Sequence, residues 1–105
     1  MIEKTLFFET PKVKDVEGLV KVLQNVVPKL GYRPTPSPGV IALHDGIDNR
    51  TYYFESGNSG CYYEFDLING IYRASIQFKK FSEVHYKTVL QKVSERFPQF
   101  FLAYA

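Results

Sequence analysis

The dipeptide Asn69-Gly70 constrains the fold of this chain more than any other short segment. It separates two runs of alternating residues, and Asn-Gly readily adopts the positive φ angles of a two-residue type I′ hairpin turn. Such a turn fixes the register of the two strands, since it sets which residues lie opposite one another. One face of the predicted hairpin then pairs Leu67 with Tyr72, Phe65 with Ala74, Tyr63 with Ile76, and Cys61 with Phe78. The other face pairs Asp66 with Arg73, Glu64 with Ser75, and Tyr62 with Gln77. A shift of one residue would destroy both patterns.

A second turn signal at Gly57-Asn58 selects the same inner face. With these two residues as the loop, Phe54 lies opposite Cys61 and Tyr52 opposite Tyr63 on the apolar face, while Tyr53 lies opposite Tyr62 on the other. Before them, a four-residue loop over 46–49 would pair Leu43 with Tyr52 and Ile41 with Phe54, although Asp45-Gly46 is an alternative turn. The region 40–79 is therefore predicted to be a four-stranded antiparallel meander.

The residues before the meander predict a strand, a helix and a stiff connection. Apolar and polar residues alternate from Ile2 to Glu9, which is typical of a strand. An apolar residue then recurs every three or four positions from Val16 to Leu30, which predicts a helix capped by Asp15 and ended by Pro28 or Gly31. The segment 33–39 contains three prolines, so we expect it to be extended and to stay outside the sheet ladder. A polyproline II recognition segment over Pro34 to Pro38 is the alternative.

A second helix is predicted to begin at Ser82. One stripe of this helix is apolar, and Glu83 and Lys87 form a favourable i, i+4 pair on the opposite side. The stripe consists of Tyr86, Val89, Leu90, Val93 and Phe97. After Pro98 the chain is apolar, and the tail Phe100 to Tyr104 must be covered. It would pack across its own core, add to a sheet edge, be buried in a homodimer interface, or occupy a groove of a partner.

The order of elements predicts an α+β fold in a single domain over residues 1–105. The order is β-α-β-β-β-β-α, and an antiparallel meander sheet with two helices packed on one face buries all three apolar surfaces at once. This order resembles that of one half of the TATA-box-binding proteins and, more loosely, that of the helix-grip folds. The resemblance is in element order and implies a fold only, because unrelated functions share such folds.

The charge and cysteine content favour an ordinary cytoplasmic protein. The 13 basic and 11 acidic residues of the 105 are interspersed, with a net charge of +2, so the chain lacks the basic stripe typical of duplex-binding domains. A single cysteine cannot form an internal disulfide, and the first residues do not read as a secretory signal. No apolar run is long enough to span a membrane, and no membrane association is expected.

One cluster of residue types could carry chemistry. His44 with Asp45 and Asp48 could ligate a metal or form a general base, but a zinc site needs three or four ligands. The other candidates, His85 and Cys61, are predicted to lie on the second helix and on the inner sheet face. We therefore interpret the segment from His44 to Asp48 as a hairpin tip and Cys61 as a packing residue. We expect no enzyme activity, no cofactor and no metal.

The outer face of the meander is the candidate binding surface. Tyrosine and arginine are enriched at the centres of protein interfaces. We expect a non-enzymatic protein-binding module, such as a small inhibitor of the immunity or phage counter-defence type. Its candidate partner-binding residues are Tyr53, Tyr62, Glu64, Arg73 and Gln77.

Three other interpretations of the tyrosines of the meander remain open. The first is single-stranded nucleic-acid binding, in which Tyr53 and Tyr62 stack on bases, although the surrounding carboxylates would repel phosphate. The second is a small-ligand pocket between the helices and the sheet, lined by Tyr52, Tyr63 and Tyr72. The third is a solvated sheet face whose tyrosines reflect β propensity alone.

Overall fold

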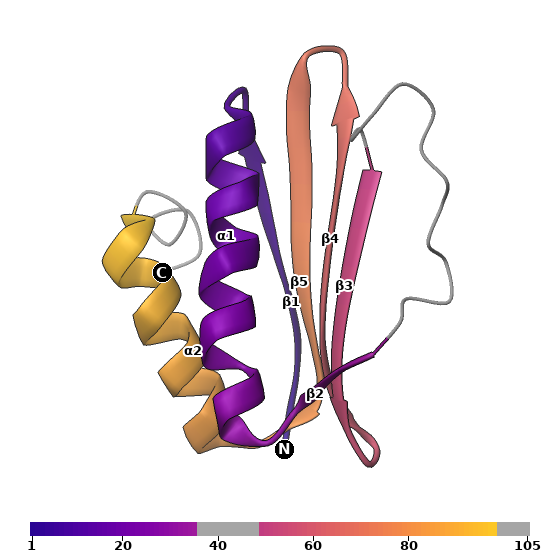
Figure 1. Ribbon diagram of the computed structural model, residues 1–105, viewed down its shortest axis with the longest axis vertical. Coiled ribbons are helices and arrows are strands. Elements are labelled where there is room, and N and C mark those ends of the chain that lie inside the picture. The colour runs from indigo at the N-terminus through magenta and orange to yellow at the C-terminus, as the bar shows by residue number, and fades with distance from the viewer. Residues whose placement is uncertain (36–48, 99–105) are drawn as a thin grey trace.

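The computed structural model describes residues 1–35 and 49–98, which form one antiparallel sheet and two helices (Figure 1). The five strands lie in the order β1-β5-β4-β3-β2. Along the chain the elements are β1 Ile2–Thr10, α1 Val13–Val26, the short 3₁₀ helix η1 Pro28–Leu30, β2 Arg33–Thr35, β3 Asn49–Ser56, β4 Ser59–Ile68, β5 Ile71–Phe81 and α2 Glu83–Arg96. The predicted order β-α-β-β-β-β-α and the α+β class are confirmed.

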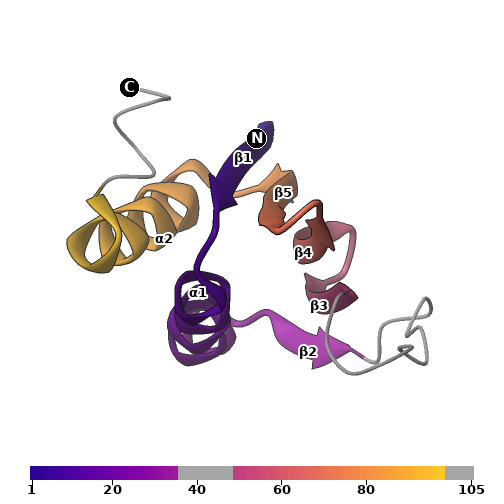
Figure 2. The same ribbon diagram turned by 90° about the horizontal axis from the view of Figure 1, so that it is seen from above.

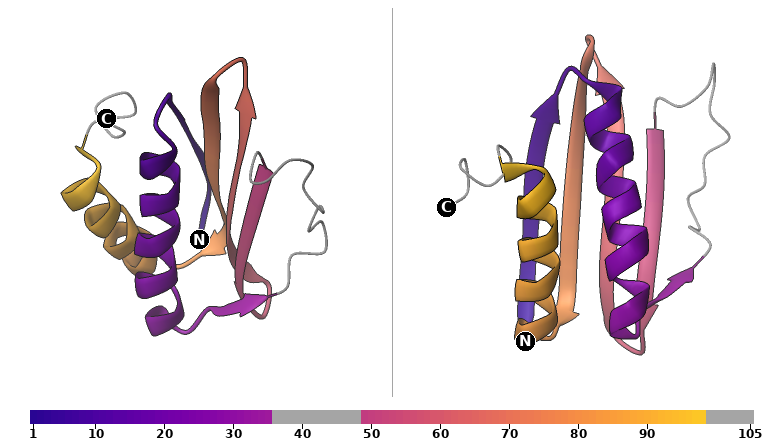
Figure 3. Two further views of the ribbon diagram at one scale, coloured as in Figure 1. Left: turned by 45° about the horizontal axis from the view of Figure 1, so that its top comes forward. Right: turned by 60° about the vertical axis from the view of Figure 1, so that its left-hand side comes forward.

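Both helices lie on the same side of the sheet. Seen from above, the strands form an arc, and α1 and α2 occupy its concave side (Figure 2). In Figure 3, α2 lies in front of β1 and β5, and α1 lies closer to β3. The convex face of the sheet carries neither α1 nor α2.

The two hairpins have the register that their turns predict. Asn69 and Gly70 have φ angles of 52° and 79°, as a type I′ turn requires, and Gly57 has a φ of 59°. On the inner face, Phe54, Cys61, Tyr63, Phe65, Ala74, Ile76 and Phe78 are buried, whereas Tyr52, Leu67 and Tyr72 are partly buried. Tyr53 lies opposite Tyr62 on the outer face. These pairings confirm both predicted hairpins residue by residue.

The strand that precedes β3 differs from the prediction. Arg33–Thr35 does join the ladder, as β2, and Pro34 occupies the position opposite Phe54 that was expected for Ile41. Proline is tolerated because β2 is an edge strand, and because the backbone groups of Phe54 point towards Cys61 rather than Pro34. Residues 36–48, which contain the expected pairs of Leu43 and Ile41, lie outside the described residues.

The start of α1 also differs from the prediction. Asp15 lies in the first turn instead of capping it, and the N-cap is Lys12, which makes no side-chain capping bond. The carboxylate of Asp15 accepts a hydrogen bond of 2.6 Å from the Thr10 hydroxyl, whose oxygen accepts one of 3.1 Å from the Lys12 amide. These two hydrogen bonds tie the first turn of α1 to the end of β1 through Thr10. The helix ends before Pro28, and Gly31 follows with a φ of 102°.

The second helix begins as predicted. Ser82 is its N-cap, and the Ser82 hydroxyl accepts a 3.4 Å hydrogen bond from the His85 amide. Glu83 and Lys87 form the expected ion pair at 3.6 Å. The predicted apolar stripe packs against the core, with Leu90 only partly buried.

Gly18 permits the close approach of α1 and α2. A Cβ atom at this buried position would lie 2.6 Å from Cζ of Phe97. We expect Gly18→Ala to lower the free energy of unfolding by about 1 kcal/mol, because overpacking costs about 1–3 kcal/mol while alanine gains about 1 kcal/mol in helix propensity. Urea denaturation of the two proteins measures the difference.

The control for this prediction removes the Phe97 ring. In a Phe97→Leu background, Gly18→Ala should stabilise the protein, since the propensity gain remains and the overlap is relieved. If Gly18→Ala stabilises the otherwise unchanged protein as well, the contact with Phe97 does not restrict this position.

Candidate functional site

A row of side chains crosses all five strands on the face away from the helices. The register places Thr5 beside Gln77, Gln77 beside Tyr62, Tyr62 beside Tyr53, and Tyr53 beside Thr35. The two tyrosines are at the centre of this row because β4 and β3 are interior strands. Both strands that carry the tyrosine pair are therefore hydrogen-bonded to a neighbouring strand on each side.

The two tyrosine rings are held in a fixed arrangement. Tyr53 and Tyr62 pack edge to face, with ring centroids 4.9 Å apart and an interplanar angle of 85°. The Tyr62 hydroxyl donates a 2.6 Å hydrogen bond to the Glu55 carboxylate, and the Tyr53 hydroxyl donates one of 3.2 Å to Glu64. Each tyrosine is therefore tied to a carboxylate two strand positions away along the sheet.

Gly60 makes the position of Tyr62 possible. A Cβ atom at Gly60 would overlap the ring and hydroxyl of Tyr62, so the ring lies over a bare stretch of backbone. This cover buries part of the ring, and burial, reinforced by the hydrogen bond to Glu55, raises the pKa of Tyr62 to about 12. Tyr62 is consequently a neutral hydrogen-bond donor throughout the physiological pH range.

A bulge in β5 shapes one end of this face. Ile2 pairs with Phe81 and Lys4 with Phe78, so that Lys79 and Lys80 together lie opposite Glu3. Lys80 has a φ of 48°, and its carbonyl accepts a 2.7 Å hydrogen bond from the Ser59 hydroxyl. The bulge brings Lys79 and Glu3 to the same end of the face.

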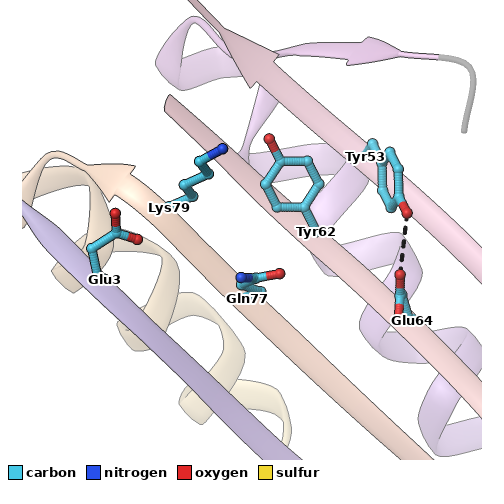
Figure 4. Close-up of a pocket in the computed structure, with 6 residues that line it drawn as sticks. All are labelled: Glu3, Tyr53, Tyr62, Glu64, Gln77 and Lys79. Atoms are coloured by element: carbon cyan, nitrogen blue, oxygen red, sulfur yellow. Dashed lines mark hydrogen bonds between the residues drawn. The ribbon is translucent and has the colours of Figure 1, made fainter. Parts of the chain in front are cut away.

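These side chains surround an open hollow of about 360 Å³ (Figure 4). It is lined by Glu3, Tyr53, Tyr62, Glu64, Gln77 and Lys79. Four of the five predicted site residues are thus brought together.

Arg73, the fifth predicted site residue, lies outside the hollow. It is opposite Asp66 on β4 and forms an ion pair of 3.4 Å with Glu9 on β1, where both side chains are largely exposed. The sequence interpretation missed the contribution of Glu3, because alternation alone does not reveal that β1 pairs with β5.

The outer face is acidic although the whole chain is basic. By register it carries five carboxylates, those of Glu3, Glu9, Glu55, Glu64 and Asp66, against three basic side chains, those of Arg33, Arg73 and Lys79. Among the described residues, no lysine or arginine forms an ion pair with the carboxylates of the tyrosine pair, Glu55 and Glu64. Within residues 1–35 and 49–98, each of these two carboxylates accepts a tyrosine hydroxyl, and Arg33 is the cross-strand neighbour of Glu55.

The other candidate groups do not assemble into a second site in residues 1–35 and 49–98. No three His, Cys, Asp or Glu side chains of this part could hold a metal ion. His85 contacts the core, where its Nδ1 lies 2.7 Å from the Tyr32 hydroxyl, and Cys61 is buried. His44, Asp45 and Asp48 lie outside the described residues, as does the tail Phe100 to Tyr104. Neither described helix is long and apolar enough to cross a membrane.

Comparison with known proteins gives no family. No family model matches the chain, and no curated protein matches it. The interpretation of the site therefore depends on its own geometry and charge.

Gly60→Ala tests whether the bare backbone under Tyr62 holds that ring in place. The added methyl group should displace the ring and break the hydrogen bond to Glu55, which exposes the hydroxyl to water. We expect the pKa of Tyr62 to fall from about 12 towards the ordinary value of 10.0. The ¹³Cζ chemical shift of each tyrosine, followed by NMR during an alkaline titration, measures this change.

Glu55→Gln is the matched variant for that titration. It keeps a hydrogen-bond acceptor for the Tyr62 hydroxyl but removes the negative charge, so the pKa of Tyr62 should fall less than in Gly60→Ala. An unchanged pKa in Gly60→Ala would show that Tyr62 is not held by its position over Gly60.

Proposed function

We propose that this protein is a non-enzymatic module that binds another protein through the outer face of its sheet. The observation that carries the proposal is the Tyr53–Tyr62 pair, which is fixed by hydrogen bonds to Glu55 and Glu64 at the centre of the face that lies away from α1 and α2. Side chains ordered before binding lose less conformational entropy when a partner arrives.

The composition of the face supports a protein partner. Tyrosine combines a large apolar surface with a polar tip, and it is among the residues most enriched where interfaces are most deeply buried. Around the tyrosine pair the face is polar and charged, as an interface rim is. The excess of carboxylates favours a partner with a basic surface, because complementary charge accelerates encounter and fixes orientation.

The same observations argue against the two binding alternatives. A nucleic-acid strand would bring phosphates close to Glu55 and Glu64, whose carboxylates already hold the tyrosine hydroxyls. In the interior, the Tyr63 hydroxyl donates a 3.0 Å hydrogen bond to the Val16 carbonyl, so that tyrosine is committed to packing between sheet and helix. A protein partner fits the outer face better than either alternative.

A small inhibitor of the immunity or phage counter-defence type remains our proposal for the class of module. Such an inhibitor needs a stable scaffold and one rigid recognition face, and it needs no catalytic group of its own. The outer face, with its tyrosine pair and its excess of carboxylates, would provide such a recognition face for a target whose own surface is basic.

The experiment compares proteins captured by the immobilised chain and by the double variant Tyr53→Ser/Tyr62→Ser, using quantitative mass spectrometry. We expect at least one protein to be captured by the original chain and lost by the double variant. Val84→Ser is the control, because Val84 is an exposed apolar residue on α2, away from the outer face. Circular dichroism checks that all three proteins fold.

Two outcomes of this comparison would contradict the proposal. An identical set of captured proteins would remove the outer face as the binding surface. Capture that depends on the tyrosines but disappears after nuclease treatment, with a gel shift of single-stranded DNA that weakens steeply with salt, would indicate nucleic-acid binding instead.

A further inference from the structure

We infer that the hollow on the outer face receives an arginine side chain of the protein partner. This inference rests on the proposed function and deepens it, since it specifies the chemistry that the partner must present. It follows from the placement of Glu64 and Gln77 and from the two fixed aromatic rings that line the hollow, against which a cation would lie.

Glu64 supplies a carboxylate that is positioned but not neutralised. One of its oxygens, Oε1, accepts the hydrogen bond from Tyr53, and a carboxylate has further lone pairs for additional donors. Among the described residues, no basic side chain forms an ion pair with it. A guanidinium group could therefore donate to a carboxylate that its own chain already holds in position.

The rings of Tyr53 and Tyr62 supply the second part of the site. Their edge-to-face packing keeps the two rings at a large angle, and both rings line the hollow beside Glu64. Cations are attracted to the faces of tyrosine rings, and the planar guanidinium of arginine also stacks on such faces. The carbonyl oxygen of Gln77 adds a neutral acceptor on the neighbouring strand.

The arrangement of charges places the arginine at one end of the hollow. In Figure 4, Tyr53 and Glu64 lie at the end opposite Glu3 and Lys79, with Tyr62 and Gln77 between. Lys79 repels a second cation at its own end, so the guanidinium is expected near Tyr53 and Glu64. Arginine is favoured over lysine because its several donors can serve Glu64 and Gln77 simultaneously.

An NMR titration with Nα-acetyl-arginine amide tests the inference directly. We expect saturable shifts of the backbone amides of Tyr53, Tyr62 and Glu64, with millimolar affinity, as is usual for so small a ligand. The citrulline analogue has nearly the same shape and keeps N–H donors, but it lacks the positive charge. It should bind about tenfold more weakly, because its hydrogen bond to Glu64 is no longer charge-assisted and its attraction to the tyrosine rings is lost. Glu64→Gln should weaken arginine binding by a similar factor.

Glu9→Gln is the matched control for Glu64→Gln. Glu9 is a carboxylate on the same face, but it is paired with Arg73 outside the hollow, so its replacement should leave the titration unchanged. Equal shifts with the citrulline analogue would overturn the inference, and so would stronger binding of Nα-acetyl-lysine amide or an absence of saturable shifts.

The outcome can be separated from that of the proposed function. If the double tyrosine variant loses a captured protein while Glu64→Gln retains it and the arginine analogue does not bind, then only the arginine inference fails. If the double tyrosine variant retains every captured protein, the proposed function fails regardless of the titration.

Discussion

Phe78→Ala should lower the free energy of unfolding by about 3–5 kcal/mol, which is a large part of the 5–15 kcal/mol typical of a domain. Phe78 is fully buried and lies opposite Cys61 on β4. Its ring packs edge to face against Tyr86 of α2 at 4.9 Å and against Phe81 at 5.1 Å between centroids. Truncation would leave a cavity at the junction of sheet and helix, and urea denaturation measures the loss.

Phe7→Ala is the matched control, because it is the same substitution in a strand of the same sheet. The Phe7 side chain is 57% exposed on the outer face, so its removal should change stability by no more than about 0.5 kcal/mol. If Phe78→Ala does not fold, Phe78→Leu leaves a smaller cavity, and its loss of stability can still be compared with that of Phe7→Ala. Equal losses at Phe78 and Phe7 would contradict the assignment of the core.

The Cys61 thiol should react with a disulfide reagent at least about 1,000-fold more slowly in the folded protein than in urea. Burial raises the pKa of this thiol from 9.0 to about 12, which lowers the fraction of reactive thiolate near neutral pH about 1,000-fold. The side chain is also inaccessible, with Phe54 and Phe78 as its cross-strand neighbours. The release of thionitrobenzoate from Ellman's reagent follows the reaction.

A cysteine moved to the adjacent turn provides the control for this rate. In the variant Asn58→Cys/Cys61→Ser, the thiol lies at an exposed turn position three residues away. It should react at a rate close to that of the unfolded chain, since neither burial nor occlusion acts there. Rapid reaction of Cys61 in the folded protein would contradict both its burial and its role in packing.

Local signals were sufficient to predict the central hairpins and the outer tyrosine pair. Asn69-Gly70 and Gly57-Asn58 each fix a register, and both registers agree on which face is apolar, so the pairing of Tyr53 with Tyr62 follows from the sequence. The signal for the start of α2 was also local, because the Ser82 side chain caps the helix by accepting a hydrogen bond from the nearby His85 amide.

The remaining features depend on contacts between distant segments. Alternation predicts that residues 2–9 form a strand, but it carries no information about which strand they pair with, so Glu3 was not expected at the hollow. The pairing of β2 with β3 was not predicted, because proline argues against a strand. Pro34 is accommodated because it lies on an edge strand, at a position where no backbone N–H donor is required. Tyr32 is buried through stacking on Phe81, at 4.4 Å between centroids, which no sequence period predicts.

The pairing of β1 with β5 has a consequence for the order of folding. The β4–β5 hairpin closes over a two-residue turn, whereas Ile2 pairs with Phe81, which lies 79 residues further along the chain. Closing so long a loop carries a large entropic cost, and such non-local pairings slow folding.

We expect β1 to join the sheet after the hairpins have formed. Leu6→Ala, in β1, should therefore accelerate unfolding more than it slows refolding. Ile76→Ala, in β5, should mainly slow refolding. During synthesis, β1 would then leave the ribosome before the other four strands of this sheet, yet join the sheet after the β3–β4 and β4–β5 hairpins.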